Sequence, residues 1–348
     1  MNIMQSSFEP LEYEYGEELK HIERIGRLAY KSEDKISEDD SSAKSFVMML
    51  VNKGHLAAIE HASLCYEVDK KTYEDFRWAM NQYEDDHHKK CFLRGTDYPP
   101  RIPAYNCLAS IVHHRYVISG NLRAWYEFLK WSLPPAYESK SNDLMKDINR
   151  LWEIFGKVSS ISEDECQDGR FIRHIDPKTL TRQERLVHQD VSIKITCDRG
   201  VTHEIVRHRP PSYLQESTRF CNYSLGKFGT SISVIDLASG MRIEGRYSEQ
   251  GAVRDVVYDK ILDEWQLAME DAEKHYLKMI ELGASPQIAR SVLPNSTKTE
   301  IVMTSNLAEW EWFFKLRTDK AAHPQMREIT IPLYDYFIEN VFYEEVNK

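Results

Sequence analysis

The sequence lacks a closely spaced pair of cysteines. Its six cysteines are scattered along the chain, and no two of them form a C-x-x-C motif. This spacing argues against a zinc ribbon and against a dithiol redox motif, since both place two thiols close together in the chain. Unpaired cysteines persist best where thiols stay reduced, so we expect a cytoplasmic protein.

Long hydrophobic runs are missing as well. No segment approaches the roughly 18 apolar residues that indicate a membrane-spanning helix. The amino-terminal residues show no basic start followed by an apolar stretch, which a secretory signal would have. Because 42% of the 348 residues are hydrophobic and 29% are charged, we expect a soluble globular protein that does not contact a membrane.

The sequence also lacks an excess of positive charge. The formal net charge is −10, with 45 Lys and Arg residues against 55 Asp and Glu residues. A surface of this charge does not attract nucleic acid through its overall field, so we expect no nucleic-acid partner. Any binding site for an anion must therefore be a local cluster of basic residues.

Hydrophobic periodicity predicts both helices and strands. Apolar residues recur at helical spacing in residues 17–28, 43–50, 121–131, 248–282 and 306–317. Alternation of apolar and polar residues predicts strands at 63–69 and 191–197, and residues 298–305 also have strand character. The mixture predicts an α+β fold, with a mixed or antiparallel sheet flanked by long helices.

The middle of the chain, residues 70–190, contains breakers such as TDYPPRIP and SLPPAYESKSN together with runs of charge. Such segments are typical of surface insertions around helices rather than of one continuous sheet. We therefore predict one domain spanning residues 1–348, with a largely helical insertion in the region 70–190.

The most concentrated basic feature is the triplet Arg207-His208-Arg209, followed after seven residues by Ser217. Guanidinium groups match phosphate oxygens with two parallel hydrogen bonds, and the amides and hydroxyls of a following loop can complete the cradle. A solvated basic turn is the simpler interpretation of a bare R-H-R. The serine at this distance and the following QESTRF favour an anion receptor instead.

The two arginines of the triplet are expected to diverge. On a continuous helix Arg207 and Arg209 would be turned about 200° apart. Pro210-Pro211 ends the helix at this place and forces an extended exit. The arginines can therefore reach different ligands or different subunits.

This segment resembles the signature of the flavin-dependent thymidylate synthases, which is R-H-R, seven residues and a serine. Other blocks are similar to the family and follow its order, namely GHLAAIEH at 54–61, DRGVTHEIVRHR at 198–209, ARSVLP at 289–294, TSNLAEW at 304–310, FFKLR at 313–317 and AHPQMRE at 322–328. Agreement by chance in so many separate blocks is not expected. The chain departs from the family at Leu214-Gln215, where Asn-Glu is common, and at Phe220, where Tyr is common.

The resemblance implies a role for each matching residue. The residues expected to bind FAD are Arg207, His208 and Arg209, with His55, Glu60 and Asn306 near the cofactor and His323 beside the isoalloxazine ring. The residues expected to bind dUMP are Gln215, Glu216, Ser217, Thr218 and Arg219, with Glu204 and Arg290 completing the nucleotide pocket. Arg317 is expected to face the uracil ring as the catalytic residue.

Side-chain chemistry fits these implied roles. Arg219 and Arg290 are permanent cations suited to a 5′-phosphate, and Arg317 can polarise a ring carbonyl where negative charge develops. Covalent attack by Ser217 on C6 of uracil is an alternative, but a serine needs a base within hydrogen-bond reach and the spacing reveals none. We therefore assign Ser217 to phosphate binding.

The activity implied by the resemblance is conversion of dUMP to dTMP, with methylenetetrahydrofolate as carbon donor, FAD as hydride mediator and NADPH as reductant. The family also implies a homotetramer. We expect no metal, because the adjacent pairs His87-His88 and His113-His114 lack the spacing of a metal site. Two alternatives stay open, an enzyme of the same fold that makes another 5-substituted dUMP such as the hydroxymethyl form, and a non-catalytic protein that binds nucleotide or RNA.

Overall fold

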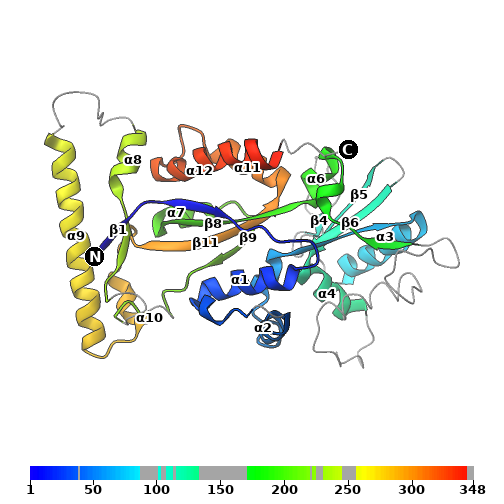
Figure 1. Ribbon diagram of the computed structural model, residues 1–348, viewed down its shortest axis with the longest axis horizontal. Coiled ribbons are helices and arrows are strands. Elements are labelled where there is room, and N and C mark those ends of the chain that lie inside the picture. Colours follow the sequence, from blue (N-terminus) through cyan, green and yellow to red (C-terminus); the bar gives the residue numbers. More distant parts are fainter. Residues whose placement is uncertain are drawn as a thin grey trace.

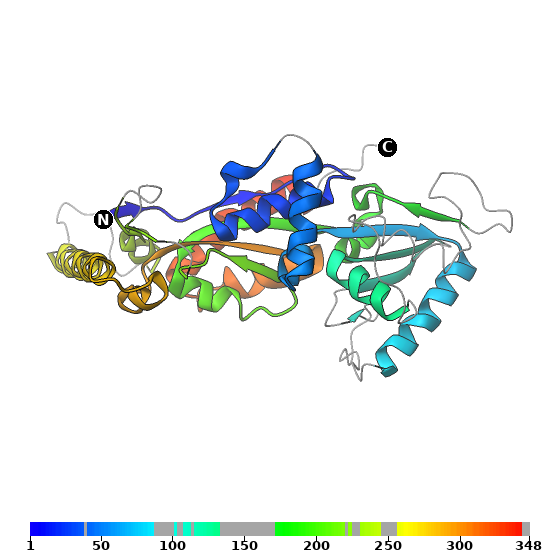
Figure 2. The ribbon, with the colours of Figure 1, turned by 90° about the horizontal axis from the view of Figure 1, so that it is seen from below.

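Two antiparallel sheets lie end to end in this chain, with helices packed on both sides of the longer sheet (Figure 1). The computed structural model describes residues 1–37, 40–86, 101–102, 107–112, 115–132, 171–219, 222–224, 230–244 and 256–342. The result is an elongated molecule with a long helix at one end and a five-stranded sheet at the other (Figure 2).

The central sheet has four strands in the order β2-β8-β11-β9, and every neighbouring pair is antiparallel. Its strands are β2 (Ser7–Pro10), β8 (Asp190–Asp198), β9 (Ser212–Gln215) and β11 (Lys298–Asn306). The two long strands pair along their whole length, from Lys298 opposite Asp198 to Asn306 opposite Asp190. This pairing confirms the strands predicted at 191–197 and 298–305.

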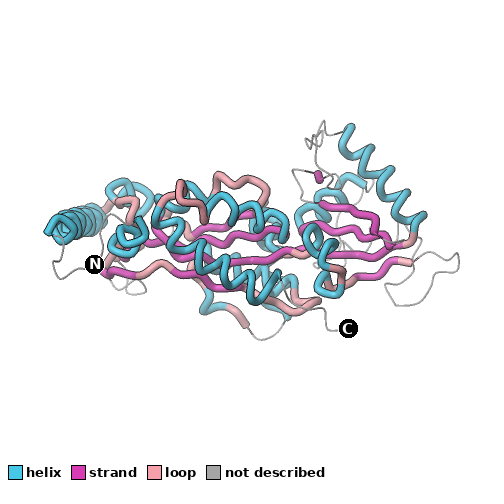
Figure 3. The backbone as a smooth tube through the Cα atoms, turned by 90° about the horizontal axis from the view of Figure 1, so that it is seen from above, coloured by secondary structure: helices cyan, strands magenta, loops and turns pink. Residues whose placement is uncertain are grey.

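Alternation along these strands produces two faces with different partners. On one face Ile195 and Ile301 pack against α7 (Arg199–Ile205), α11 (Leu307–Arg317) and α12 (Pro324–Phe337) in an aromatic core that contains Trp310. On the opposite face Val302 packs against Leu28 of α1 (Glu18–Tyr30). The sheet therefore lies between two helical layers, which Figure 3 shows from above.

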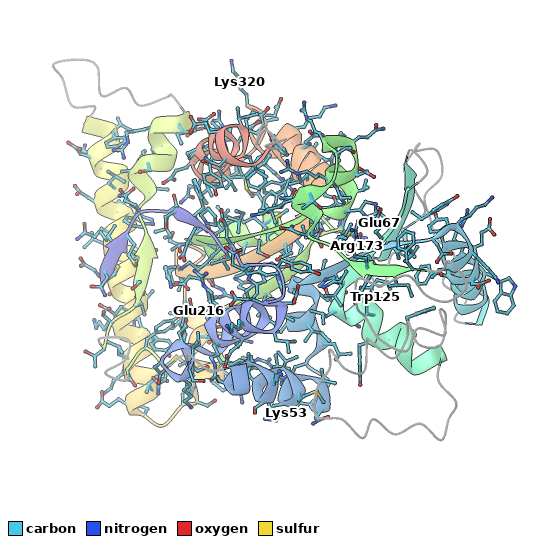
Figure 4. All side chains as sticks on the ribbon, turned by 45° about the vertical axis from the view of Figure 1, so that its right-hand side comes forward. Lys53, Glu67, Trp125, Arg173, Glu216 and Lys320 are labelled. Atoms are coloured by element: carbon cyan, nitrogen blue, oxygen red, sulfur yellow. The ribbon has the colours of Figure 1, made fainter. Side chains whose placement is uncertain are left out.

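The second sheet has five strands in the order β4-β5-β6-β3-β7. Its strands are β3 (Ser63–Val68), β4 (Arg101–Ile102), β5 (Cys107–Val112), β6 (Arg115–Asn121) and β7 (Ile172–His174), and all neighbours are antiparallel. Trp125 of α4 (Leu122–Ser132) packs edge-on against Tyr66 of β3, with ring centroids 5.5 Å apart. On the edge strand β7, Arg173 forms an ion pair with Glu67 (Figure 4).

The α+β class with antiparallel sheets is confirmed, but the region 70–190 needs a correction. We predicted surface insertions around helices there, whereas β4 to β7 extend a sheet into it. The reason is that β6 pairs with β3, and β3 lies outside the region, so the decisive contact is not local. Breakers on either side of these short strands dominated the local pattern. The histidine pairs His87-His88 and His113-His114 lie outside the described residues.

The remaining elements complete the helical layers and one end of the molecule. The short parallel pair β1 (Asn2–Met4) and β10 (Ser233–Ile235) lies near α9. The other described helices are α2 (Asp40–Asn52), α3 (Lys70–Asp86), α6 (Arg182–His188), α8 (Leu237–Glu244), α9 (Val256–Glu281) and α10 (Pro286–Ala289). Short helical turns are η1 (Glu33–Lys35), η2 (Leu56–His61), η3 (Pro177–Thr179), η5 (Arg290–Val292) and η6 (Ile338–Phe342).

Two features of the sequence mark helix ends near α9 and α10. Gly283 follows the end of α9 with a φ of +95°, a left-handed conformation that favours glycine. Ser285 precedes α10, which begins with Pro286. The predicted start of the long helix at 248 lies outside the described residues. In the part of the chain that is described, we find no helix with the length and hydropathy needed to cross a membrane.

Candidate anion-binding site

The R-H-R triplet directly follows the end of α7, where the chain turns before it enters β9. The helix begins at a cap in which the side chain of Asp198 accepts a hydrogen bond from the backbone N–H of Val201 at 2.6 Å. It ends at Ile205, and β9 starts at Ser212 after the two prolines. Along this exit Arg207 and Arg209 are exposed, whereas His208 is buried.

The arginines of the triplet point toward solvent. In the described part of the chain, neither the Arg207 nor the Arg209 side chain has a hydrogen-bond or ion-pair partner. Two unpaired guanidinium groups, held two residues apart by a structured exit, form a surface that attracts an anion. The predicted divergence of the pair from a helical arrangement agrees with the end of α7 before the triplet.

His208 is turned toward the protein interior instead. Its ring packs edge-on against Phe313 of α11, with centroids 5.6 Å apart, and its Nε2 lies 3.4 Å from a carboxylate oxygen of Glu309. Its backbone carbonyl accepts a hydrogen bond from the Tyr213 hydroxyl, which also donates to Ile205 at 3.0 Å. In this chain His208 fastens the triplet to α11, and its predicted contact with FAD stays a prediction.

Arg317 and Glu204 are brought together next to the triplet. An Nη2 of Arg317 donates to the backbone carbonyl of Glu204 at 2.9 Å, and Nη1 lies 3.8 Å from the Glu204 carboxylate. The Nε of Arg317 is buried and has no hydrogen-bond partner within the described residues. The guanidinium group is therefore held at the end of α7 with donor capacity left over.

His323 lies on the same helical layer, where it precedes α12. Its Nδ1 accepts a hydrogen bond from the backbone N–H of Gln325 at 3.3 Å, so the ring caps this helix while remaining exposed. Burial raises the pKa of the nearby Asp198 carboxyl, and the charge of His323 partly opposes that effect. His323 is therefore near the start of α7.

The predicted substrate loop, residues 215–219, begins at the end of β9. The Gln215 amide donates to the hydroxyls of Thr202 in α7, at 3.1 Å, and of Thr299 in β11, at 3.2 Å. The preceding Leu214 is packed with the core under α1. At the two positions where the family commonly has Asn-Glu, this chain therefore places the Leu214 side chain toward the α1 layer and the Gln215 amide toward the α7 layer. Phe220 lies outside the described residues.

Glu216 faces the α1 side of the sheet and is 3% exposed (Figure 4). Its carboxylate lies 3.2 Å from Nζ of Lys298 and 3.7 Å from Nζ of Lys31. Both lysines also contact Glu300, Lys298 at 2.5 Å and Lys31 at 2.6 Å. We call Lys31, Glu216, Lys298 and Glu300 the lysine–glutamate cluster.

The cluster is an electrostatically balanced group of two cations and two anions. Burial would raise the pKa of Glu300, but the charges of Lys298 and Lys31 outweigh it and lower that pKa to about 2. Burial likewise lowers the pKa of Lys298, and the neighbouring Glu216 and Glu300 outweigh it, so the net shift is upward. Glu300 and Lys298 are therefore charged near neutral pH, and removal of one partner of such a buried pair typically costs about 3–5 kcal/mol.

Thr218 and Arg290 meet at the far side of the loop. Arg290, which is exposed at the start of η5, donates from Nη1 to the Thr218 hydroxyl at 3.1 Å. Ser217 is half-buried and Arg219 is exposed. The structure thus places a hydroxyl and two basic side chains on one loop and its neighbour, as a phosphate site requires.

The other three predicted cofactor residues are His55, Glu60 and Asn306. His55 accepts or donates a hydrogen bond with the Tyr30 hydroxyl at 2.8 Å, and Glu60 forms an ion pair with Arg123 at 2.5 Å. Both belong to the η2 region, on the α1 side of the central sheet. Asn306 is 2% exposed, and its side chain caps α11 by accepting from Glu309 at 3.0 Å. Asn306 is thus linked through Glu309 to His208, whereas His55 and Glu60 contact other partners.

Sequence reasoning missed Lys31, Lys298 and Glu300. The alternate spacing of Lys298 and Glu300 in a predicted strand places them on one face, which is a usable signal. Lys31 gives no such signal, because its contact with residue 216 depends on how α1 packs on the sheet.

The cavities of the described residues lie away from this site. A cavity of about 110 Å³ at the junction of the two sheets is lined by the segment 10–15, the start of β8 and the region of β7. A groove of about 370 Å³ lies between α11 and α12. Neither of these two is lined by a predicted site residue.

Comparison with protein families finds one match over more than half of the chain. The sequence profile described as "Thymidylate synthase complementing protein" matches residues 143–341. This range includes the triplet, the loop, Arg290 and Arg317.

Curated relatives give consistent matches. The chain is similar to the flavin-dependent thymidylate synthase of Pyrococcus furiosus, with 30% identity over 184 residues that cover 51% of this chain and 67% of the relative. The enzyme of the same name from Mycobacterium sp. (strain KMS) is 30% identical over 46% of this chain and 62% of the relative. The one from Mycobacterium tuberculosis is 31% identical over 42% of this chain and 56% of the relative. The matched regions thus span between 56% and 67% of these relatives.

Among solved structures, the chain is similar to a UMP/dUMP methylase from Streptomyces cacaoi bound with 5-Br dUMP. The identity is 24%, the TM-score is 0.33, and the match covers 43% of this chain and 66% of the other. The same methylase bound with 5-Br UMP gives a TM-score of 0.35 at 20% identity, over 43% of this chain and 68% of the other.

Proposed function

The chain belongs to the family of thymidylate synthase complementing proteins, and from this membership we propose that it is a flavin-dependent thymidylate synthase. The proposed reaction converts dUMP to dTMP, with methylenetetrahydrofolate as carbon donor and NADPH as reductant. The observation that carries the proposal is that α7 joins the two predicted sites. Arg207 and Arg317 lie at its end, and its Thr202 contacts Gln215 at the root of the loop.

The exposed arginines fit a dinucleotide cofactor. Arg207 and Arg209 carry permanent positive charge and face solvent without a side-chain partner among the described residues, so they can bind the diphosphate of FAD. FAD, when bound, supplies the hydride exchange between the reductant and the pyrimidine. The protein's own contribution is to hold the flavin and the nucleotide in a fixed relation.

The loop fits the phosphate of dUMP. Arg290 is already oriented by Thr218, and Ser217 and Arg219 flank that hydroxyl. A phosphate in this place would receive charge-assisted hydrogen bonds from the arginines and neutral ones from the hydroxyls. Glu204 lies beside Arg317 and completes the pocket on the side of the ring.

Arg317 is the catalytic residue in this proposal. Its guanidinium group is held by the Glu204 carbonyl, so its remaining N–H groups have a fixed direction. Facing a uracil carbonyl, they would stabilise the negative charge that develops on the ring as C5 becomes nucleophilic. We assign Ser217 to phosphate binding, since its hydroxyl has no histidine as a hydrogen-bond partner in the described part of the chain.

We also propose a homotetramer in which each flavin site uses more than one copy. His55 and Glu60 lie on the α1 side of the central sheet, whereas Arg207 lies at the end of α7 on the other side. We infer that each cofactor contacts the two sets from different copies. Within each copy we retain a single domain of residues 1–348, with β4 to β7 of the second sheet inside the inserted region 70–190.

The test is whether the purified protein binds flavin and uses it only when the nucleotide is present. We expect the protein to show the absorption bands of bound FAD. We expect NADPH to be consumed with dUMP and methylenetetrahydrofolate, and only slowly when dUMP is left out. A protein that takes up no FAD and does not oxidise NADPH would contradict the proposal and favour a non-catalytic nucleotide- or RNA-binding protein.

A further inference from the structure

The lysine–glutamate cluster lies directly beneath the root of the substrate loop. Its four charged side chains are 14% (Lys31), 3% (Glu216), 14% (Lys298) and 17% (Glu300) exposed. Lys298 and Glu300 lie in β11, and Glu216 is the residue that follows β9. Lys31 is the residue that follows α1. The cluster therefore joins the loop to a helix that lies far from it in the sequence.

Glu216 is fixed through both its backbone and its side chain. Its N–H donates to the carbonyl of Glu300 at 2.8 Å, and its carboxylate lies between the two lysines. The next N–H, that of Ser217, points at the carbonyl of Ala29 in α1 at 3.4 Å. Because Ser217 and Thr218 follow at once, their positions depend on how firmly Glu216 is held.

Lys31 occupies an unusual backbone conformation for its residue type. Its φ of 50° and ψ of 50° are in the left-handed region, at the position after a helix where glycine is preferred. A residue with a side chain pays a steric penalty there that glycine does not. The Lys31 side chain is the part that glycine would lack, and it is this side chain that contacts Glu300 and Glu216.

We propose that Lys31 and Lys298 are positioning residues that hold the substrate loop, through Glu216, in the form that binds the phosphate of a pyrimidine nucleotide. This inference rests on the proposed function. Neither lysine needs to touch the substrate, because each acts through Glu216. Loss of either would leave the loop in its binding form for only part of the time, which raises the apparent dissociation constant in proportion.

The variant Lys31→Gly tests positioning, with stability measured alongside. It removes the charge of a buried pair and also relieves the left-handed strain, which offsets only part of that loss, so we expect a moderately lower melting temperature. The dissociation constant for dUMP, measured by calorimetry, should rise roughly tenfold if the loop is then ordered about one tenth of the time. The KM for dUMP should rise with it, while kcat at saturating dUMP stays close to that of the unaltered enzyme. Lys31→Arg keeps the charge and should restore dUMP binding.

A matched control is Lys194→Met. Lys194 lies on the same face of the central sheet, opposite Val302, and forms a partly buried ion pair with Glu9. It makes no contact with the loop in the described residues, so dUMP affinity should not change. If positioning acts through Glu216, the effects of Lys31→Gly and Glu216→Gln on dUMP affinity should also fail to add in the double variant.

The outcomes separate the two proposals. If the unaltered protein binds no dUMP, the proposed function fails and this inference fails with it. If the unaltered protein binds dUMP and Lys31→Gly binds it equally well, the proposed function stands and the positioning role is overturned. A lower melting temperature with unchanged dUMP affinity would make the cluster a structural support only.

Discussion

Arg207 and Arg317 differ in what their guanidinium groups already contact. Arg317 is held by Glu204 at 2.9 Å, whereas Arg207 is exposed and has no side-chain partner among the described residues. A group that is already oriented suits a reacting centre, since catalysis depends on donors fixed before the reaction starts. An exposed guanidinium group without a side-chain partner, such as that of Arg207, suits the binding of a negatively charged cofactor. The two residues should therefore fail in different ways when changed.

For Arg317→Lys we expect turnover to fall while FAD remains bound. A lysine ammonium keeps the positive charge but cannot reproduce the planar set of donors. Loss of one preorganised donor of this kind costs roughly 10²-fold in kcat. Steady-state kinetics together with the flavin absorption of the purified variant measure both quantities. Turnover equal to that of the unaltered enzyme would remove the catalytic role of Arg317.

Arg207→Ala should instead weaken FAD binding. A hydrogen bond to a charged group contributes about 1.5–3 kcal/mol, which corresponds to roughly ten- to hundredfold in affinity. We expect the variant to purify with less flavin and to regain activity when FAD is added in excess. Flavin content and FAD affinity like those of the unaltered protein would contradict this assignment.

Two buried histidines on the α1 face should make stability depend on pH. The rings of His21 and His61 are 2% and 0% exposed, and they are linked through the hydroxyls of Ser192 and Thr304. Burial lowers the pKa of each ring to about 3, from a usual value of about 6.5. Below about pH 6.5 the unfolded chain binds protons that the folded chain does not bind until about pH 3, so stability is lost as the pH falls.

The expected slope is about 1.4 kcal/mol of unfolding free energy per pH unit for each such histidine. Urea unfolding of His61→Gln between about pH 7 and about pH 5 should show a slope smaller by that amount. His275→Gln, on the exposed side of α9, serves as the control and should keep the original slope. An unchanged slope in His61→Gln would mean that this ring is not neutral in the folded protein.

Among the elements, the pair α1 and α2 is the place where close packing decides stability. A Cβ atom added at Gly26 would lie 2.6 Å from Cε1 of Phe46, closer than side chains tolerate. Helix propensity favours alanine over glycine by about 1 kcal/mol, but overpacking a core costs about 1–3 kcal/mol. The Phe46 ring is 7% exposed and also contacts the Arg27 guanidinium at 4.5 Å, so it has little room to move.

We therefore expect Gly26→Ala to destabilise the protein by about 1 kcal/mol, since the steric cost exceeds the gain in helix propensity. Thermal unfolding measures the effect. In a chain that already carries Phe46→Leu, the same change should cost less or become stabilising, because the smaller side chain leaves room. A stabilising effect of Gly26→Ala in the original chain would show that Phe46 moves easily.

The same elements show what the sequence can and cannot reveal. The strand at 191–197 and the helix starting at Asn306 were predictable because their signals are local, an alternation in one case and a capping side chain in the other. The strands β5 and β6 were not, since they depend on pairing with β3 across the chain. The contact of Lys31 with Glu216 was not predictable either, because it joins residues that lie far apart in the sequence.

For the site, residue types were easier to predict than directions. The triplet pattern identified three residues as one group, but only the structure separates the exposed Arg207 and Arg209 from the buried His208. Glu216 is expected to bind substrate, which stays a prediction, and the structure adds that two lysines enclose its carboxylate. The direction of a side chain near β9 depends on which face of the sheet it occupies. That face is set by the pairing of β9 with β11.

On the scale of the whole molecule, the separated cofactor residues predict an assembly. If each flavin site draws His55 from one copy and Arg207 from another, a mixture of His55→Ala and Arg207→Ala chains would contain some sites with both native residues. We expect the mixed assembly to recover part of the FAD binding that either variant lacks alone. The native mass should correspond to four chains of 40.8 kDa. A monomer, or no recovery on mixing, would contradict a shared site.

The most direct test of the account is the identity of the nucleotide that the enzyme makes. Purified protein is supplied with dUMP, methylenetetrahydrofolate, FAD and NADPH, and the nucleotides are then analysed by mass spectrometry. If the arginines at the end of α7 and the loop that follows β9 hold flavin and dUMP together, the product is dTMP. A product heavier than dTMP by one oxygen, or dUMP recovered unchanged, would contradict that claim.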